Sequence, residues 1–354
     1  MKKNISKFVF LAMTAGVLIS CDKEESLNSD NSVYDYKEGA YVVNEGEWGQ
    51  NNGTLQFIDL INNTITDDIY YSQNKQMMGD LFQDICIYGS KIYCTLTESS
   101  KVLVLDRDGK LVKNISMKNQ EGQPLKPRYM KSYDGNVYVT AYDEQVHKLD
   151  TASLEITASA KVGSYPEALT IANNKLFVNN AGYYGSGNTV SVIDLNSFEN
   201  IKTIEVPLNP YNQSVTVNDE VYIVCCKLYG ENGEASTLVK IDPKTYKTSE
   251  ITTASKIAAR NNEIYIIYND WYIENSLSYK VYNVSENKII NDKFINKDIA
   301  SNPNSINVDP INGNIYVANI KEGGLGEVIS FSQLGVVLSK YNTGYYTSKV
   351  AFAY

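Results

Sequence analysis

The side chains best suited to holding a ligand are aromatic, and they gather in a few short segments. Both tryptophans of the chain, Trp48 and Trp271, belong to this set. Rigid rings offer a large contact area and lose little side-chain entropy on binding. The four segments are Glu47-Trp48-Gly49, Tyr183-Tyr184-Gly185, Leu228-Tyr229-Gly230 and Asp270-Trp271-Tyr272. They predict recognition through ring contacts.

Residue types that serve catalysis or metal binding are scarce by comparison. The chain has a single histidine, His147, which nearly removes multi-histidine metal sites and leaves little room for histidine acid–base chemistry. No CxxC, GxSxG, HExxH, P-loop or dinucleotide-binding glycine pattern is present. The segment Asp106-Arg107-Asp108-Gly109 starts like a calcium loop but lacks the remaining ligands, so we interpret it as a turn. We therefore expect no catalytic residue, no metal and no cofactor, and a structural role for the histidine.

Four cysteines remain beyond the N-terminal segment, and we interpret them as small buried hydrophobic residues. Cys86 and Cys94 fall on neighbouring strands of one hairpin. A three-residue loop would make them face each other, whereas the two-residue loop Gly89-Ser90 would not. Cys225 and Cys226 are adjacent on one strand and should point to opposite faces. The sequence leaves open whether disulfides form.

A pattern that recurs about every 40–50 residues supplies the elements that position the aromatic segments. A strand with an aromatic residue is followed by a loop and by a second strand that ends near aspartate, as in Phe57-Ile58-Asp59 and Val192-Ile193-Asp194. Repeats of this length built from short strands are typical of propeller blades. The seven aromatic positions are Tyr41, Tyr93, Tyr138, Phe177, Tyr222, Tyr265 and Tyr316.

The repeat predicts an all-β fold, a seven-bladed β-propeller of four-stranded antiparallel blades over residues 40–354. In the fourth unit we expect strands A to D at about 166–171, 175–180, 189–194 and 200–206. The first unit begins at its second strand, Tyr41-Val42-Val43, and the chain ends in an unassigned strand, residues 347–354. This C-terminal strand is predicted to complete the first blade and close the ring, which removes open sheet edges.

The aromatic segments fall between strands B and C of units one, four, five and six, where the loops are longest. In a propeller these loops lie on the same face as the entrances to strand A, which add further aromatic and polar side chains. The alternative is that the rings only pack the loops onto the blades. The complete predicted ligand-binding set is Trp48, Phe82, Arg128, Tyr165, Tyr183, Tyr184, Tyr211, Tyr229, Trp271, Tyr272, Asn304 and Tyr346.

The N-terminal segment predicts export and lipid anchoring. Three lysines among the first seven residues precede an apolar stretch, Phe8 to Ile19, that is too short to span a bilayer comfortably. The stretch ends in the lipobox Leu18-Ile19-Ser20-Cys21, so residues 1–20 are predicted to be a lipoprotein signal peptide and Cys21 the lipidated residue. Residues 21–39 are predicted to be an acidic flexible tether. The formal net charge of −9 argues against nucleic-acid binding.

The opening of the repeat resembles a known family. The run Tyr41-Val42-Val43-Asn44-Glu45-Gly46-Glu47-Trp48-Gly49, continuing into Gly53-Thr54-Leu55, resembles the first blade of the YncE-like surface lipoprotein propellers. Within that group the chain is similar to the BtuG-type proteins. The resemblance implies a surface-exposed, outer-membrane lipoprotein that binds a corrinoid such as vitamin B12. It would pass this ligand to a TonB-dependent outer-membrane transporter and touch the membrane only through its lipid anchor.

Two other classes of function remain open from the sequence. A propeller enzyme, such as a lactonase-like hydrolase or a quinoprotein, usually needs clustered carboxylates with a metal at the channel mouth, where Asp84 and Glu167 are the candidates. A scaffold that docks a glycan or a protein partner would need no small ligand.

The lipobox and the acidic run Asp22-Lys23-Glu24-Glu25, which resembles the surface-export signal of lipoproteins in some gut-dwelling Gram-negative bacteria, generate one prediction. Protease shaving of intact cells should remove the protein, because Cys21 holds it outside the outer membrane. Accessibility only after lysis would contradict the surface location, and Cys21→Ser, which cannot be lipidated in this way, should release the protein from the membrane fraction.

Overall fold

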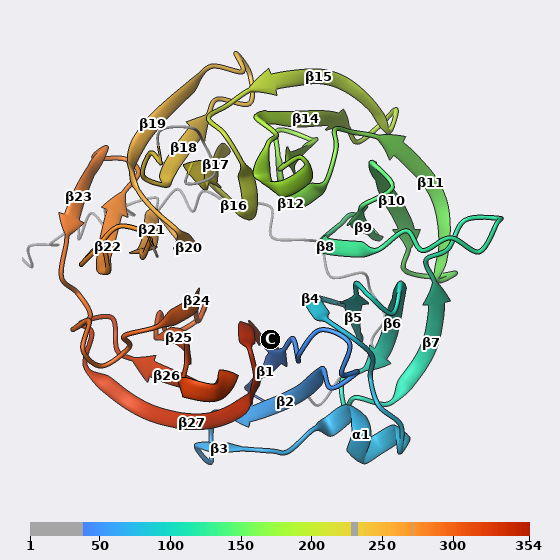
Figure 1. The fold of residues 1–354 in the computed structure, drawn as a ribbon, viewed down its shortest axis with the longest axis horizontal. Coiled ribbons are helices and arrows are strands. Elements are labelled where there is room, and N and C mark those ends of the chain that lie inside the picture. The colour runs from blue at the N-terminus through green and yellow to red at the C-terminus, as the bar shows by residue number, and fades with distance from the viewer. Residues whose placement is uncertain (1–37, 228–232, 271) are drawn as a thin grey trace, which may run out of the picture. The chain divides into compact units, whose positions relative to one another are not determined.

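The structure is a computed structural model that describes residues 38–227, 233–270 and 272–354. These residues form seven four-stranded antiparallel sheets arranged as blades around a central axis (Figure 1). The predicted all-β, seven-bladed propeller is therefore confirmed. The lipobox with Cys21, the signal peptide and most of the tether lie outside the described residues.

Each blade contributes its strands in chain order from the axis outward, except that the last strand of the chain belongs to blade 1. Blade 1 contains β28 (Thr347–Phe352), β1 (Gly39–Asn44), β2 (Thr54–Asp59) and β3 (Thr64–Ile65). Blade 2 contains β4 (Phe82–Tyr88), β5 (Lys91–Leu96), β6 (Lys101–Asp106) and β7 (Leu111–Ser116). Blade 3 contains β8 (Pro127–Tyr133), β9 (Asn136–Ala141), β10 (Gln145–Asp150) and β11 (Glu155–Lys161). Blade 4 contains β12 (Pro166–Ala172), β13 (Lys175–Asn180), β14 (Thr189–Asp194) and β15 (Glu199–Glu205), within one residue of the predicted strands.

The remaining blades follow the same plan. Blade 5 contains β16 (Pro210–Val217), β17 (Glu220–Cys225), β18 (Thr237–Ile241) and β19 (Thr248–Thr253). Blade 6 contains β20 (Lys256–Arg260), β21 (Glu263–Tyr268), β22 (Ser278–Asn283) and β23 (Lys288–Asn291). Blade 7 contains β24 (Pro303–Val308), β25 (Ile315–Ile320), β26 (Leu325–Phe331) and β27 (Val337–Tyr345). Among the described residues, the connections contain the short helical segments α1 (Ile69–Asn74), η1 (Tyr183–Gly185) and η3 (Glu322–Gly324). No helix of the described residues is long and apolar enough to cross a membrane.

The repeated aromatic residue of each unit packs between blades. All seven of these rings are buried. Tyr93 of blade 2, for example, shares a core cluster with Met130 and Val139 of blade 3, and Tyr138 of blade 3 shares one with Leu176 and Val178 of blade 4. Because blades pack face against face, both faces of their inner strands are buried. This explains why simple polar–apolar alternation is weak in the sequence.

The repeated aspartate at the end of strand C shapes the turn into strand D. In blade 4, Asp194 Oδ1 accepts hydrogen bonds from the backbone N–H groups of Asn196 and Ser197, at 2.9 and 3.0 Å. The same contacts recur at Asp59, Asp150 and Asp242. Such a side-chain-to-backbone turn needs a short acceptor at its first position, which is why the sequence repeats aspartate there. The segment from Asp106 to Gly109 is the equivalent turn, as predicted.

The other chemical candidates have structural partners. The loop between β4 and β5 is the two-residue one, so Cys86 lies opposite Tyr93 and Cys94 opposite Ile85. Cys86, Cys94, Cys225 and Cys226 are all free, which answers the question that the sequence left open. His147 lies buried on β10, where its ring nitrogens contact Ser159 Oγ at 2.8 Å and Asp143 Oδ1 at 3.3 Å.

The C-terminal strand closes the ring. β28 pairs antiparallel with β1, with Val350 opposite Val42 and Lys349 opposite Val43. The Ala353 N–H donates to Gly39 O, at 2.9 Å, and extends the ladder to the end of blade 1. Thr347 Oγ1 donates to Asn44 Oδ1 at 2.6 Å. The first and last strands therefore depend on each other, although no covalent bond joins them.

Removing residues 347–354 should lower the melting temperature by about 10 °C or more, since each kcal/mol moves the midpoint of a large domain by roughly 2–4 °C. The deletion exposes the edge of β1 and the apolar faces of blades 1 and 7. Thermal melts of the full-length and truncated proteins measure this, with deletion of Tyr354 alone as the control. An unchanged midpoint in the longer deletion would show that the ring closes in another way.

The C–D turns generate a pH-dependence. The N–H groups of Ser197 and Asn196 hold the pKa of Asp194 below its ordinary value. Its contribution to stability is therefore complete above the pKa of an unfolded aspartate, about 3.9, and is lost as the pH falls through the lower folded-state pKa.

We expect Asp194→Ala to lower the melting temperature by a few degrees at neutral pH. Asp194→Asn should keep much of that stability, because Asn283 accepts the equivalent bond in blade 6, while losing this site's acid sensitivity. Urea unfolding between pH 7 and pH 3 distinguishes the two variants. Equal acid sensitivity in the wild type and Asp194→Asn would show that the carboxylate charge does not matter.

Candidate functional site

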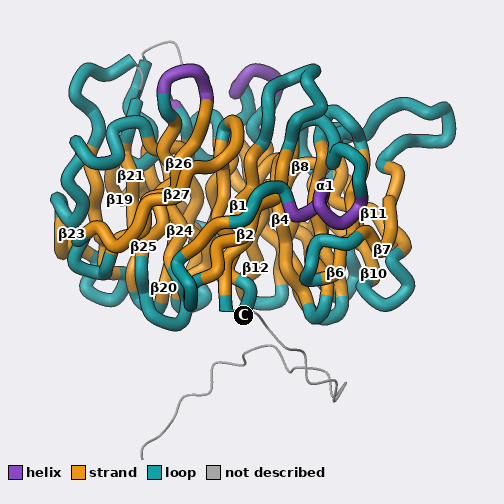
Figure 2. Tube along the Cα trace, turned by 90° about the horizontal axis from the view of Figure 1, so that it is seen from below, coloured by secondary structure: helices purple, strands orange, loops and turns teal. Residues whose placement is uncertain are grey.

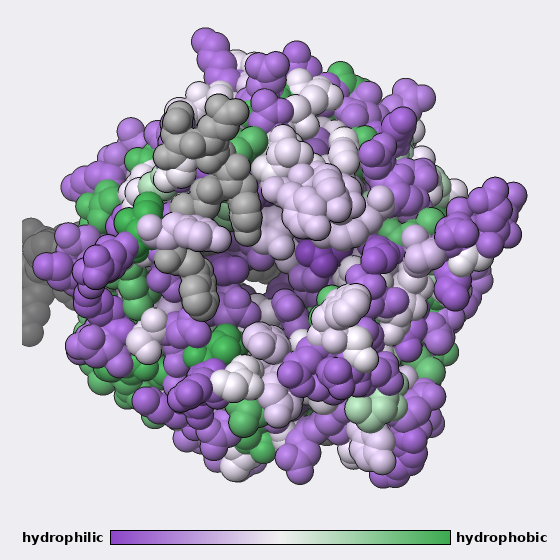
Figure 3. All heavy atoms as spheres, viewed as in Figure 1, coloured by the Kyte–Doolittle hydropathy of each residue, from purple (hydrophilic) through white to green (hydrophobic). Residues whose placement is uncertain are grey.

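The loops between strands B and C differ in length and lie on one face of the ring. They are long in blades 1, 4, 5 and 6 and short in the others, as the sequence predicts. Figure 2 shows η1 and η3 along the upper edge of the ring and the C-terminus at the lower edge. Figure 3 views the upper face, which we call the loop face, with a hollow at its centre.

A row of tyrosine rings crosses the loop face between blades 3 and 4. The ring of Tyr142 lies 4.6 Å from that of Tyr165, which lies 5.3 Å from Tyr183, which in turn lies 4.2 Å from Tyr184 (centroid distances). Tyr142 and Tyr165 are partly buried, whereas Tyr183 and Tyr184 are 56% and 80% exposed. We call these four residues the tyrosine row. Together they form a preformed aromatic wall that leads from the interior to solvent.

The loop that carries the exposed end of the row is held in an unusual conformation. Tyr184 has φ 50° and ψ 34°, in the left-handed region that non-glycine residues rarely adopt. Gly182 has φ 68°, and a Cβ there would lie 2.3 Å from the backbone nitrogen of Gly187. The Gly182 N–H donates to Ser164 O at 3.0 Å, which ties the loop to the entrance of strand A.

A buried ion pair supports the inner end of the tyrosine row. Arg128 Nε donates to Glu167 Oε2 at 3.0 Å, and both side chains are almost fully buried. The Tyr142 hydroxyl donates to Glu167 Oε1 at 2.7 Å, and the Arg128 guanidinium lies 4.9 Å from the centre of the Tyr142 ring. Arg128 also donates to Gln83 Oε1. The arginine thus orients Tyr142 from below and fixes the start of the row.

Burial is the largest influence on the pKa values of Glu167 and of the tyrosines near it. It raises the pKa of Glu167 above its ordinary value, with Arg128 acting in the opposite direction. Burial likewise raises the pKa of Tyr142 and Tyr211. Both phenols therefore stay neutral at physiological pH, and Tyr142 keeps the proton that it donates to Glu167. Glu167 accepts bonds from two partners, which favours a positioning role over general-base chemistry.

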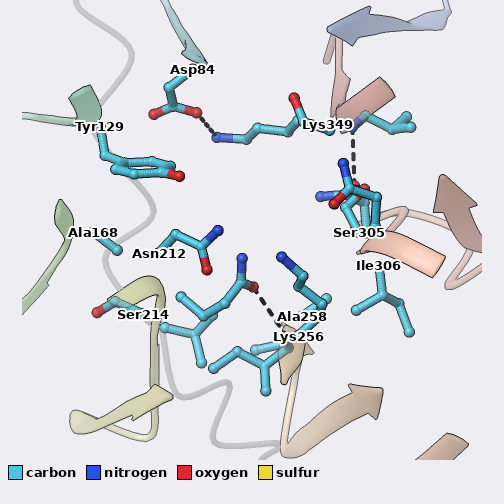
Figure 4. Close-up of a pocket in the computed structure, with 18 of the residues that line it drawn as sticks. Asp84, Tyr129, Ala168, Asn212, Ser214, Lys256, Ala258, Ser305, Ile306 and Lys349 are labelled. Atoms are coloured by element: carbon cyan, nitrogen blue, oxygen red, sulfur yellow. Dashed lines mark hydrogen bonds and ion pairs between the residues drawn. The ribbon is translucent and has the colours of Figure 1, made fainter. Parts of the chain in front are cut away.

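The innermost strands line a central cavity of about 340 Å³. The strand registers place one channel-facing position per blade at the same depth, opposite the second residue after the repeated aromatic. Asp84 lies opposite Thr95, Lys256 opposite Ile267, Ser305 opposite Ala318 and Lys349 opposite Val43. In blades 3, 4 and 5 the pairing of strands A and B is irregular at this position. It is occupied there by Tyr129 in blade 3, Ala168 in blade 4, and Asn212 and Gln213 in blade 5. Figure 4 shows Asp84, Tyr129, Ala168, Asn212, Lys256, Ser305 and Lys349 around the cavity.

Lys349 and Lys256, which both line the cavity, differ in whether an acidic group neutralises them. Lys349 Nζ donates to Asp84 Oδ1, and Asp84 Oδ2 accepts from the Met130 N–H at 2.8 Å. Lys256 points into the cavity (Figure 4), and within the described residues its amine has no ion pair or hydrogen bond. Burial lowers the pKa of Lys256, while the more distant Cys226 and Glu45 act to raise it. Its charge is thus poorly compensated.

The predicted ligand-binding residues do not all meet at one place. Arg128, Tyr165, Tyr183 and Tyr184 come together at the tyrosine row, and Tyr211 lies close enough to Arg128 and Glu167 to feel their charges. Trp48 and Tyr272 are 74% and 80% exposed in the loops of blades 1 and 6, apart from the row. Asn304 lines the cavity, and Tyr346 lies beside η3. Phe82 is fully buried in the core and presents no ring to the face, whereas Tyr229 and Trp271 lie outside the described residues.

Sequence reasoning missed three residues that the geometry singles out. Tyr142 was overlooked because it lies in the short loop of blade 3, and only long loops were expected to carry ligand contacts. Lys256 and Lys349 were overlooked because a lysine inside a strand usually faces solvent. Aligning strand A of every repeat would have revealed them, since each occupies the position that faces the channel.

Asp84 and Glu167, the two carboxylates that the sequence offered for an enzyme, are each bound by neighbouring groups. Asp84 is bound by Lys349 and by a backbone N–H, and Glu167 is bound by Arg128 and Tyr142. Over residues 38–227, 233–270 and 272–354, no group of three or more His, Cys, Asp or Glu side chains is placed to hold a metal ion.

Comparisons with known proteins support the architecture. The model of a family described as "Domain of unknown function (DUF5074)" matches residues 38–336. No curated protein matches the chain in sequence. Hydrazine synthase of Kuenenia stuttgartiensis has a similar structure, with a TM-score of 0.57 and 16% identity over 75% of this chain and 86% of that one. Dihydro-heme d1 dehydrogenase NirN in complex with DHE has a TM-score of 0.59 and 10% identity over 89% and 75%. The WD40 domain of Neurospora crassa Pan2 has a TM-score of 0.52 and 14% identity over 72% and 76%. At such identities the likeness shows the fold alone.

Proposed function

The chain belongs to the DUF5074 family of domains of unknown function, and we propose that it is a surface-exposed, non-enzymatic lipoprotein that captures a corrinoid on its loop face. It would deliver this ligand to a TonB-dependent outer-membrane transporter. The observation that carries the proposal is the tyrosine row, which places preformed rings, exposed at their outer end, on the loop face between blades 3 and 4.

The chemistry of the row suits a large, flat ligand with a polar edge. The rings lie 4.2–5.3 Å from one another, so neighbouring rings already restrict their conformations. They therefore lose little side-chain entropy when they bind a macrocycle. Tyrosine hydroxyls and nearby amide side chains can bond to the amide-rich rim of a corrinoid. Exposed aromatic groups on a monomer also mark interaction sites more often than random surface.

The position of the chain's start supports outward presentation. The described chain begins at Glu38 and Gly39, where the Leu60 N–H donates to Glu38 O and the Ala353 N–H to Gly39 O. This is the edge of the ring that also holds the C-terminus, opposite η1 and η3 (Figure 2). A tether that leaves from this edge would let the loop face point away from a membrane anchored through Cys21.

The choice of a corrinoid comes from the resemblance of residues 41–55 to the first blade of YncE-like lipoprotein propellers, and of the chain to the BtuG-type proteins. In the structure this segment forms β1 and the loop that presents Trp48. Its conformation is stabilised by Asn52, whose Oδ1 accepts from the Glu47 N–H at 2.7 Å, and by Asp80, which accepts from the Gly49 N–H at 2.9 Å. A loop built this firmly can hold an exposed tryptophan ready for contact.

Truncation of exposed rings tests the proposal. We expect Tyr184→Ala and Trp48→Ala each to weaken cyanocobalamin binding by about 10-fold or more, because a few central aromatic residues dominate such sites. Their melting temperatures should barely change, since both side chains make few core contacts. Calorimetric titration beside a thermal melt of each variant provides both readouts.

The matched control is Tyr71→Ala, which removes a half-exposed tyrosine from α1 at the side of the ring. It should leave affinity unchanged. The corrinoid proposal fails if the wild type does not bind cyanocobalamin, and the site assignment fails if both loop variants bind as tightly as the wild type.

A further inference from the structure

The central cavity holds a cationic group with no partner, in a protein of net charge −9. Lys256 begins β20, and its register opposite Ile267 turns its side chain toward the axis. Figure 4 shows the amine directed into open space between Asn212 and Ser305. Lys349, at the same depth in blade 1, is neutralised by Asp84. The two lysines are thus equivalent by position and different in charge balance.

The carboxyl group of Glu45 acts on the charge of Lys256 but neutralises it only weakly. Glu45, at the start of the loop after β1, lines the same cavity but forms no ion pair with Lys256 in the described residues. Burial raises the pKa of Glu45, and the larger of its two cationic influences is Arg128. A carboxyl group that is shared and partly disfavoured in its charged form is a poor counterion. The cavity keeps an unmatched positive charge.

Neutral hydrogen-bonding groups surround this charge. Gln213 lines the cavity, and its Oε1 accepts from the Ile257 N–H at 3.1 Å, which leaves its amide N–H₂ group without a hydrogen-bond partner among the described residues. Asn212 presents its amide to the same space (Figure 4). A positive amine beside amide N–H donors is a combination that binds oxyanions in proteins.

We propose that the central cavity is a binding site for a compact oxyanion, a carboxylate or phosphate group, held by Lys256 together with Asn212 and Gln213. Its volume of about 340 Å³ is sufficient for a small ligand. A bound anion would supply the counterion that the protein lacks and restore part of the solvation that burial removes from the amine. The site is separate from the tyrosine row and does not rest on the corrinoid proposal.

Inorganic phosphate is the probe that tests the site. At constant ionic strength, phosphate should bind the wild type with a Kd of about 1 mM or tighter and raise its melting temperature, whereas chloride should not. Lys256→Met keeps the length of the side chain and removes its charge. We expect this variant to bind phosphate about 10-fold or more weakly, while it melts at or above the wild-type temperature without phosphate, because it no longer buries an unpaired charge.

The matched control is Lys244→Met, which makes the same change in net charge at an exposed lysine in the C–D turn of blade 5. It should bind phosphate as the wild type does. Lys256→Arg, which keeps the charge, should retain most of the binding. Equal phosphate affinity in the wild type and Lys256→Met, or no phosphate or acetate binding by the wild type, would overturn the proposal.

A competition experiment identifies where the oxyanion comes from. If saturating phosphate weakens cyanocobalamin binding in the wild type but not in Lys256→Met, the cavity receives an anionic group of the ligand on the loop face. If the two ligands bind independently, the cavity takes a free anion. Failure of corrinoid binding leaves the phosphate titration interpretable, so the two proposals fail separately.

Discussion

The pairing of β28 with β1 is the constraint on which the rest of the molecule depends. Six blades take all four strands from consecutive residues, and one blade is assembled from both ends of the described chain. Without this pairing the ring would be an open arc, with a free strand edge and two uncovered blade faces. The channel would also lose Lys349, the partner of Asp84. Closure therefore stabilises the fold and completes the charge pattern of the cavity.

A closed ring of similar blades turns small differences in sequence into a site. Each blade offers one inward position at a given depth, and most of the outer architecture is shared, down to the aspartate that shapes the C–D turn. What differs is the side chain at that position and the length of the loop above it. The tyrosine row exists because the loop of blade 4 is long enough to carry Tyr183 and Tyr184 across to Tyr165. The cationic cavity exists because two lysines face inward and, among the described residues, only one of them, Lys349, forms an ion pair, with Asp84.

The buried ion pair of Arg128 and Glu167 supports the tyrosine row on the loop face. Arg128 and Glu167 lie at the inner end of the tyrosine row, and Arg128 bonds to Gln83 of blade 2 and to Glu167 of blade 4. Breaking such a pair would leave an uncompensated buried charge, which costs more than the intact pair contributes. This cost favours a single arrangement of Tyr142 and its neighbours. Rigidity at the base of the row is what makes exposed rings useful for binding.

The sequence by itself determined the repeat, the number of blades, the strand bounds of blade 4 and the closure by the last strand. It could do so because every blade must bury an aromatic residue between its neighbours and must turn sharply after strand C, and both demands recur locally along the chain. It also placed Tyr183, Tyr184 and Trp48 in exposed loops, since loop length is visible in the spacing of the strands.

Only the tertiary structure decided which of these residues meet. Phe82 is the first residue of strand A in blade 2, and Arg128 is the second residue of strand A in blade 3. The Phe82 ring is nevertheless buried in the core, whereas Arg128 supports the tyrosine row. Tyr142 joins the row across a blade boundary, and Lys256 and Lys349 face one cavity from blades that lie far apart in the sequence. Irregular pairing at the starts of the inner strands shifts side chains in blades 3, 4 and 5. Local sequence patterns do not record such shifts, because they arise from contacts among blades that close around a common axis.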